Sequence, residues 1–564
     1  MAKKKEEIVI SETQTLATSI WNEKEYYERS SQHVRQEWGD CYKAYKLQND
    51  KNVSPFLANL YIPKVHEAVE LLSAFLVGSK QNINASPEGK GDTKKAIIVG
   101  KYLDFVWRKV LKVRDKLVTA VKQAILFGNG VLKVTWDAEY DEPSVEVVSL
   151  TDIYFDYFYR DIQESPSVIH AIRKSTKSIK EDEKYNPKRK NVISTAQDPV
   201  KDAEFDTADN APQEDQGTET TIYERWTKEK VVTIAPTATG WEVIRDIKNP
   251  YTNSDGDGII PFVKIRFKTN PLPNRAYDIG AIQPTLKLQF AFNDAVNQFF
   301  DNASLINNKQ WIKRRGAKIN PADLVRRPGG VITVENIDTD LKGEEVSDIK
   351  QSLLELIKLI DEEFQQASMV TNLLKGVPNA QFATEIANAQ NNVQTLLDSI
   401  ADNINDSLSE LGHMVLQIVL QNAEKIDSIK VLDNDERVVF IEGVTAEDLR
   451  GDYDIAIQPD RSNLIPKVVK QKQLLDAMNM AIANPLLMQK YPNLPERLFK
   501  RWLENGGETD TDYFFETELT QEMNPQMGQA QPTGQGMMTS GQGLTPEANM
   551  DSAMGSAMDT GTQI

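Results

Sequence analysis

The stretch Phe127-Gly128-Asn129-Gly130-Val131-Leu132-Lys133-Val134-Thr135-Trp136 marks the point at which the periodicity of the sequence changes. Before it, apolar residues recur at the spacing of an amphipathic helix that is interrupted near Lys112. After Gly130, residues 131–136 alternate between apolar and polar, as do residues 145–148 and 153–155, which predicts strands. The turn residues between the two patterns end the helix. The expected fold class is therefore α+β.

Outward from this switch, helical patterns dominate the chain. They predict helices over 8–47 (one long or two short), 61–77, 282–305, 349–369, 382–422 and 466–503. Further strands are expected at 221–226, 231–234, 241–244, 262–267, 431–441 and 453–457. The helix over 382–422 would be about 60 Å long, which is too long for a small globule. We expect an α+β, mostly helical protein.

Two regions have too few apolar residues to form a core. Residues 176–220 are rich in Lys, Asp, Glu, Pro and Thr, and we expect an inserted, partly disordered excursion there. Residues 519–564 consist largely of Gln, Gly, Met, Thr, Ser and Pro, and are expected to form a disordered tail.

Composition excludes several classes of protein. Lys+Arg 65 against Asp+Glu 83 gives a formal net charge of −18, so most of the surface is not built to bind phosphates. The single cysteine, Cys41, excludes an intrachain disulfide framework and a cysteine-based zinc cluster. Four scattered histidines nominate no metal site, so we expect neither a metal nor a cofactor. With no membrane-spanning segment and no export signal, we expect a soluble protein.

Motifs for catalysis are equally scarce. No G-x-x-x-x-G-K-[ST] phosphate loop, no H-E-x-x-H and no G-x-S-x-G occurs. Residues 253–258 resemble the first half of a calcium loop around Asp255, but the twelfth position is Lys264 instead of Glu, which favours a plain turn. Asp152, Asp156 and Asp161 could serve a metal-dependent nuclease, although turn aspartates are the more common case.

A basic module stands out from the acidic chain. Seven cations and one acid, Asp323, lie between residues 309 and 327; the cations are Lys309, Lys313, Arg314, Arg315, Lys318, Arg326 and Arg327. Such clustering is typical of a partner surface, and a solvated loop is the alternative. The partner would be a nucleic acid or an acidic protein face.

The order of these elements resembles the portal proteins of tailed double-stranded DNA phages. The stretch 127–136 is similar to the family's helix-to-strand segment G-x-G-x-x-x-V-x-W, and residues 148–156 to the strand that follows it. Arg326-Arg327-Pro328-Gly329-Gly330-Val331-Ile332 is similar to the Pro-Gly turn of the clip. Ala383-Thr384-Glu385-Ile386-Ala387 is similar to the start of the family's long helix, although Phe382 replaces its leading Thr. Tyr453-Asp454-Ile455-Ala456-Ile457 resembles the strand after that helix.

The resemblance implies a division of the chain into portal domains: an α+β wing (1–275, with the polar insertion at about 176–220), a first stem helix (276–305), a small β clip (306–346), a second stem helix (347–369), a tunnel loop (370–381), a long spanning helix (382–424), wing-associated strands (425–460), crown helices (461–518) and the tail (519–564).

The resemblance also implies a function. About twelve identical subunits would form a ring at one capsid vertex of the virion, assembled in the host cytoplasm, through which DNA enters at packaging and leaves at ejection. The partners would be double-stranded DNA, the large terminase, the head-tail adaptor, and the major capsid and scaffolding proteins, with no membrane and no catalysis. The clip cations would meet the terminase and adaptor. The expected channel residues are Lys375, Asn372 and Asn379 in the tunnel loop and Asp361, Glu362 and Glu363 on the second stem helix.

An acidic channel wall fits the net charge, because each fixed cation on a phosphate would add affinity and slow the passage of DNA.

Two other functional classes are also compatible with the sequence. A non-catalytic helical scaffold or other head-completion protein rests on the long helix, and a metal-dependent nuclease rests on the Asp152 cluster.

Overall fold

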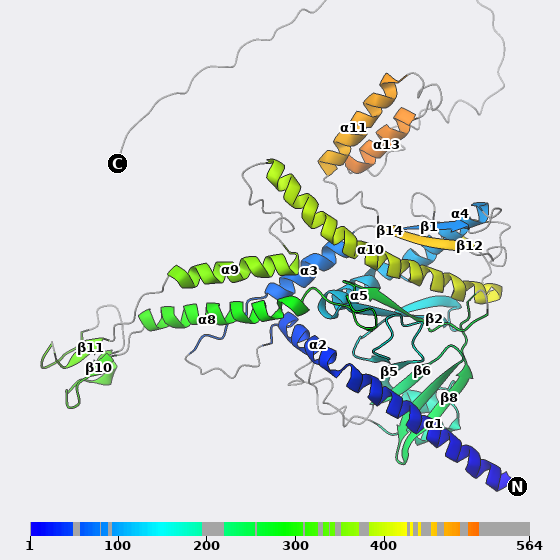
Figure 1. Cartoon of the computed structure of the whole chain (residues 1–564), viewed down its shortest axis with the longest axis horizontal. Coiled ribbons are helices and arrows are strands. Elements are labelled where there is room, and N and C mark those ends of the chain that lie inside the picture. The colour runs from blue at the N-terminus through cyan, green and yellow to red at the C-terminus, as the bar shows by residue number, and fades with distance from the viewer. Residues whose placement is uncertain are drawn as a thin grey trace, which may run out of the picture. The chain divides into compact units, whose positions relative to one another are not determined.

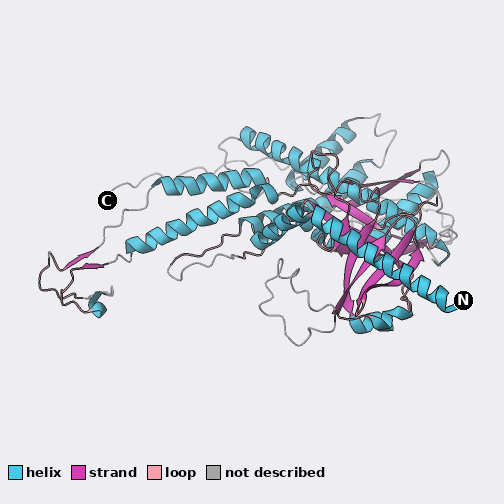
Figure 2. Cartoon of the chain, turned by 60° about the horizontal axis from the view of Figure 1, so that its bottom comes forward, coloured by secondary structure: helices cyan, strands magenta, loops and turns pink. Residues whose placement is uncertain are grey.

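The computed structural model describes residues 2–48, 57–78, 81–87, 93–194, 219–253, 256–307, 311–324, 331–337, 339–343, 351–370, 383–425, 429–432, 438–441, 453–459, 467–484 and 494–506. Residues 1–464 form one compact unit and residues 465–564 a second. The structure is mixed α+β, with several small antiparallel sheets (Figures 1 and 2).

The N-terminal region is helical, as its periodicity predicts. Its α-helices are α1 (Ala2–Ser30), α2 (Gln32–Tyr45), α3 (Lys64–Val77), α4 (Thr93–Phe105) and α5 (Val113–Phe127), with a π-helical turn at Val106–Val110 after α4. The predicted helix over 8–47 is thus two helices. The expected interruption near Lys112 is confirmed: Lys112 adopts a left-handed φ of 48° at the start of α5.

The switch stretch places two glycines where backbones touch. Gly128 ends α5 with a φ of 91°, and a Cβ there would lie 2.0 Å from the carbonyl oxygen of Asp278. A Cβ on Gly130 would lie 2.1 Å from the carbonyl oxygen of Ala120. Strand β2 (Asn129–Asp137) therefore starts directly against the helix that precedes it, which only glycine permits.

Two antiparallel sheets follow. One has the order β3-β2-β9, with β3 at Glu142–Val148 and β9 at Phe262–Arg266, and Val131 pairs with both Val148 and Lys264. The other is a five-stranded meander of β4 (Ile153–Phe155), β5 (Val168–Ser175), β6 (Glu219–Trp226), β7 (Lys230–Thr237) and β8 (Gly240–Lys248).

Helix α1 covers one face of the five-stranded sheet (Figure 2). Ala17, Ile20 and Tyr27 are buried there, and Trp21 stacks on Trp241 with ring centroids 4.2 Å apart. Alternate residues of the same strands face the other way and pack against residues 176–194.

The predicted polar insertion is therefore partly wrong. Residues 176–194 contain α6 (Thr176–Glu181) and a 3₁₀ turn (Pro187–Asn191), and bury Ile179, Tyr185 and Val192 on the sheet. Three well-spaced apolar side chains suffice for packing, even where the average composition is polar. Residues 195–218 lie outside the described part of the chain.

Helix α10 (Ala383–Gln421) is the long helix expected from the sequence, and its 39 residues correspond to about 58 Å. It is not excluded from the globular core: its apolar side chains from Leu397 to Val419 are buried in the main core with β2 and β9. Gly412 also lets it approach Ile455 and Ile457 of β14 (Tyr453–Pro459).

Strand β14 pairs with β1 (Gln81–Pro87), a strand that the sequence did not predict. The short hairpin β12 (Ile429–Leu432) and β13 (Val438–Ile441) lies before it in the chain. We call the assembly of α1–α5, β1–β9, α10 and β12–β14 the body.

A helical hairpin extends from the body (Figures 1 and 2). It consists of α8 (Leu286–Asn307), preceded by a 3₁₀ turn (Gln283–Thr285), and α9 (Gln351–Ser368). Its tip carries β10 (Trp311–Lys313), a 3₁₀ turn (Pro321–Leu324) and β11 (Leu341–Gly343). In the second unit, α11 (Lys467–Ala483) packs against α13 (Leu494–Gly506). The tail lies outside the described residues.

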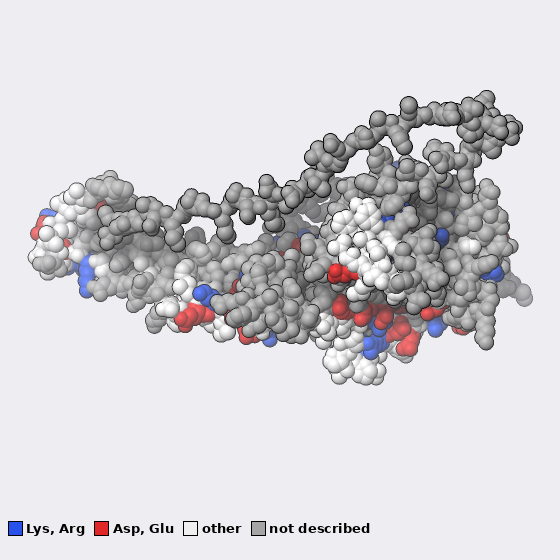
Figure 3. All heavy atoms as spheres, turned by 90° about the horizontal axis from the view of Figure 1, so that it is seen from above, with Lys and Arg blue, Asp and Glu red and all other residues white. Residues whose placement is uncertain are grey.

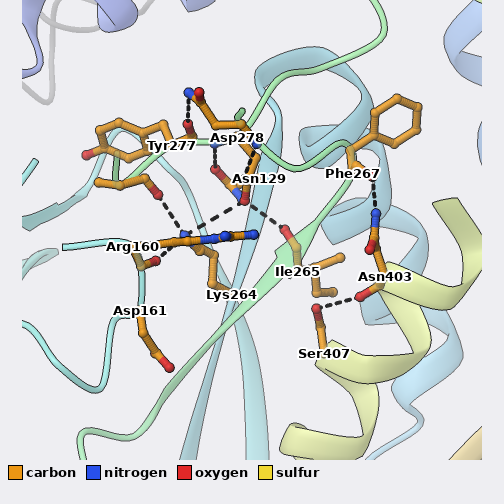
Figure 4. A network of polar contacts seen from close by, with 12 residues as sticks. Asn129, Arg160, Asp161, Lys264, Ile265, Phe267, Tyr277, Asp278, Asn403 and Ser407 are labelled. Atoms are coloured by element: carbon orange, nitrogen blue, oxygen red, sulfur yellow. Dashed lines mark hydrogen bonds and ion pairs between the residues drawn. The ribbon is translucent and has the colours of Figure 1, made fainter. Parts of the chain in front are cut away.

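A buried polar network fixes the switch stretch (Figure 4). The Asn129 side chain donates to Asp278 Oδ2 (2.8 Å) and accepts from the Asp278 backbone N–H (2.8 Å). The Lys264 ammonium lies 3.8 Å from Asp278 Oδ2 and donates to the carbonyl oxygens of Arg160 (2.6 Å) and Ala276 (2.7 Å). Asn403 of α10 donates to the Phe267 carbonyl (3.1 Å), which joins the long helix to the end of β9.

Glu410 brings a titratable group from α10 to this region. Burial raises the pKa of its carboxyl to about 7, and Asp161 adds to the rise, while Arg266 and Lys264 oppose it. Burial likewise lowers the pKa of Lys264 to about 8, against the opposing effect of Asp278. Both shifts disfavour charge in the core between α10 and β9.

The raised pKa of Glu410 predicts a pH-dependent stability. Its protonated form stabilises the fold fully below the ordinary pKa of 4.5, and this contribution is lost as the pH rises through about 7. Glu410→Gln should therefore match the parent protein at pH 4.5 and exceed it by about 1–2 kcal/mol at pH 8, after allowance for partial exposure. Urea unfolding at the two pH values measures this. Asp406→Asn, at an exposed position of the same helix, is the control, and an equal effect of Glu410→Gln at both pH values would contradict the prediction.

Candidate functional site

The hairpin carries apolar side chains that the subunit leaves exposed. Burial is concentrated near the body, at Phe292 and Val296 of α8 and Phe364 of α9. Further along both helices, large apolar side chains are 43–54% exposed: Phe300, Leu305, Leu354, Leu356 and Leu359. An exposed apolar surface on two packed helices is typical of a protein–protein interface.

An ion pair fixes the base of the hairpin. Lys64, the first residue of α3, lies 2.7 Å from Asp361 Oδ1 of α9, and its ammonium also lies 5.3 Å from the ring centroid of Phe292 on α8. One cation of the body thus contacts both helices. Sequence reasoning missed this pair, because its members are separated by nearly 300 residues and neither lies in a motif.

The Lys64–Asp361 pair separates the three acidic residues that were predicted to line the channel. Asp361 is partly buried and its charge is engaged by Lys64, whereas Glu362 and Glu363 are exposed on the same helix. Of these three residues, Glu362 and Glu363 present free carboxylates to solvent and Asp361 does not.

The tip is held by a small set of polar contacts. Trp311 pairs with Gly343 across the two strands, and its indole N–H donates to the Leu324 carbonyl (3.2 Å). The Arg314 guanidinium lies 2.8 Å from Oδ1 of Asp340, whose side chain is only 2% exposed. Asp340 Oδ2 accepts from the Asn336 backbone N–H (2.9 Å), so the carboxylate closes the loop before β11.

The predicted cations of the tip therefore differ in role. Arg314 pairs with Asp340, and Lys313 donates to the Ile319 carbonyl (3.2 Å), so both stabilise the tip itself. The side chains of all four described cations are exposed, and no such contact of Arg315 or Lys318 is found among the described residues. Lys309, Arg326 and Arg327, together with the predicted loop residues Asn372, Lys375 and Asn379, lie outside the described residues.

The aspartates considered for a nuclease occupy turns. Asp156 Oδ1 accepts from the Phe158 backbone N–H (3.0 Å), and Asp161 Oδ1 accepts from the Gln163 backbone N–H (2.9 Å). Asp152 accepts from the Thr151 hydroxyl (3.4 Å). These are the local bonds typical of turn aspartates. Within the described ranges, no group of three or more His, Cys, Asp and Glu side chains is arranged to hold a metal ion.

The calcium-like segment is also a turn where it is described. The Asn253 carbonyl accepts from the Gly256 N–H (3.0 Å), and Thr252 bridges to Gly258. Asp255 lies outside the described residues.

Surface charge is uneven on the face seen in Figure 3. Acidic atoms gather in a patch over the body, whereas Lys and Arg atoms are scattered, and charges of both signs appear at the tip of the hairpin. No helix in the described part of the chain is long and apolar enough to cross a bilayer.

Comparison with protein families gives one assignment. The family described as "Phage SU10 portal protein" matches residues 9–156 and 138–542, which is most of the chain. The chain belongs to this family. It is a phage portal protein, a structural component of the virion at the head-tail connection and not an enzyme. The resemblance noted in the sequence is thereby confirmed.

Other comparisons are more remote. The solved structure "Neck of empty GTA particle computed with C6 symmetry" matches with a TM-score of 0.39 and 12% identity, over 74% of this chain and 86% of that chain. A search of curated protein sequences gives no significant match. The portal assignment rests on the family match.

The contacts of Asp340 predict that the stability of the portal tip depends on its carboxylate. Asp340→Ala should destabilise the tip by about 1–3 kcal/mol, because it removes the ion-pair partner of Arg314 and the acceptor of the Asn336 N–H. Limited proteolysis should then cut within residues 311–343 about tenfold faster. Asp323→Ala, in the same tip, is the control, since no side-chain bond of Asp323 supports the loop in the same way. Equal cleavage rates in the two variants would rule out this role of Asp340.

Proposed function

We propose that this chain is the subunit of a closed ring that forms the DNA channel at one capsid vertex and serves genome packaging, retention and ejection. Family membership supports this role, and the exposed apolar residues of both hairpin helices carry it structurally. A neighbouring copy on each side would cover them, and repeated head-to-tail contacts close into a ring, here of about twelve subunits. The ring would assemble in the host cytoplasm and remain at the portal vertex.

The order of the elements in the fold supports a division into portal domains. The α+β part of the body would be the wing, α8 and α9 the stem, and the tip the clip. Helix α10 would be the long spanning helix, and α11 with α13 the crown. The loop 370–381 would be the tunnel loop, with Asn372, Lys375 and Asn379 as transient DNA contacts.

The tip would dock the large terminase during packaging and the head-tail adaptor afterwards. Arg315 and Lys318 support this, since they are exposed cations at the end of the hairpin in an otherwise acidic protein. Charges at the rim of an interface steer association and set specificity. The body would contact the major capsid and scaffolding proteins.

The channel wall would be acidic. Glu362 and Glu363 leave free carboxylates on α9, and the net charge of −18 disfavours lasting phosphate contacts. Duplex DNA would slide past such a wall, because counterion-releasing contacts would be few.

Assembly mass is the decisive measurement of this function. Light scattering should give the mass of a ring of about twelve subunits, and negative-stain microscopy should show a central hole. Leu359→Asp places a charge on the exposed apolar surface and should reduce the ring fraction. A small assembly without a channel, formed even with a scaffolding protein present, would favour the helical scaffold alternative.

Docking is tested by charge reversal at the tip. Arg315→Glu with Lys318→Glu should weaken binding of the purified large terminase to the ring by about tenfold or more, because it replaces attraction by repulsion. Ring mass should not change. The control is Lys184→Glu with Lys190→Glu, which alters the same number of charges at exposed positions of the body. Equal losses in both double variants would show a general charge effect instead of tip docking.

A further inference from the structure

A row of polar side chains on α8 faces the extended segment 57–63 that leads into α3. Gln289, Asn293, Asn297 and Asp301 follow each other at intervals of four residues and so share one face of the helix. The side-chain oxygen of each accepts a hydrogen bond from one backbone N–H. Gln289 accepts from Val65 (3.0 Å), Asn293 from Ile62 (3.1 Å), Asn297 from Leu60 (2.7 Å) and Asp301 from Ala58 (2.5 Å). We call these four side chains the ladder.

Two ladder amides also donate back to the segment. Gln289 Nε2 donates to the Ile62 carbonyl (2.8 Å), and Asn297 Nδ2 donates to the Leu60 carbonyl (3.0 Å). The ladder therefore satisfies backbone donors and acceptors as a neighbouring strand would. Its contacts depend on the position of the backbone and not on the side chains of the segment.

The geometry of the two partners explains why the rungs at Ala58, Leu60 and Ile62 form in step. Two residues of an extended chain span about 6.6 Å. Four residues of an α-helix rise about 6.0 Å. The segment runs opposite to α8, so the two-residue steps from Ala58 to Leu60 and Ile62 match the four-residue steps of the helix. The fourth rung, at Val65, lies three residues further on, past the turn in which the Lys64 N–H donates to the Ile62 carbonyl (2.9 Å). Leu305 follows Asp301 at the same interval and, being apolar, ends the ladder.

The end of the ladder near the body selects one register. Val65 belongs to the first turn of α3, where N–H groups have no partner within the helix. Pro63 supplies no side-chain cap, so Gln289 of α8 takes that role. The neighbouring Lys64 pairs with Asp361 of α9. Both contacts exist only when α3 and the hairpin are aligned as observed.

We propose that the ladder is a register lock that sets the axial position of α8, and with it the hairpin, relative to the body. A small displacement along α8 breaks every rung together, because all of them lie across the helix axis. A displacement of one full turn would re-form three rungs, with Ala58, Leu60 and Ile62 facing Asn297, Asn293 and Gln289. It would lose the Val65 cap and the Lys64–Asp361 pair. The hairpin is thus held at discrete positions, of which the observed one is preferred.

Hydrogen exchange of the assembled full-length protein, resolved to single amides by fragmentation, tests the lock. Asn297→Ala should accelerate exchange at Ala58, Leu60 and Ile62 together, by about tenfold or more. Asn297→Asp keeps the acceptor and loses the donor, so its acceleration should be smaller. Asp301→Ala should accelerate Ile62 as well, although its own rung is two steps away. Gln298→Ala, at the next, exposed position of α8, should change nothing.

The lock is overturned if acceleration in Asn297→Ala is confined to Leu60, or if Gln298→Ala has the same effect. The first result would reduce the ladder to independent local bonds, and the second would show a general effect of alanine on the helix. Light scattering of each variant establishes that ring mass is unchanged, and Asp301→Ala, at the far end of the ladder, decides the question if Asn297→Ala alters assembly.

Discussion

The body depends on one buried polar constraint at the switch from α5 to β2. Asn129 and Asp278 bond to each other twice, and Lys264 completes the pair with two backbone carbonyls. Burying these charges is costly unless every group finds a partner. Residues about 150 positions apart must therefore meet before the helix-to-strand turn is stable. The close approach at Gly128 and Gly130 leaves no room for an alternative backbone path.

The hairpin follows a different principle from that of the body. Its helices bury few apolar side chains within the subunit, and their exposed leucines and phenylalanines suit burial against neighbouring copies. Its position is set by polar contacts to backbone and by the Lys64–Asp361 pair. Directional hydrogen bonds fix the axial position of α8 relative to the body, whereas apolar packing alone would allow the helix to slide. A projecting element can thus be placed accurately while its apolar surface stays available for assembly.

The distribution of charge also differs between the parts of the subunit. The net charge of −18 and the exposed Glu362 and Glu363 of α9 support the proposed channel wall, on which DNA would make no lasting contacts. The described cations of the tip differ in their contacts: Arg314 and Lys313 reach acceptors within the tip, whereas Arg315 and Lys318 do not. A cluster that looks uniform in the sequence therefore contains two kinds of cation, distinguished only by whether a buried acceptor lies within reach.

The sequence by itself determined most of the helices and strands, the switch at Gly128, the helix break at Lys112, the long helix and the basic tip. These are local signals, since periodicity and turn chemistry act over a few residues. The tertiary structure alone decided what depends on distant partners. Strand β1 forms because β14 offers it an edge, residues 176–194 fold because a sheet receives three apolar side chains, and Asp361 is engaged because α3 brings Lys64 to it. The polar residues of the ladder recur at every fourth position of α8, but only the structure shows the backbone segment that they bind.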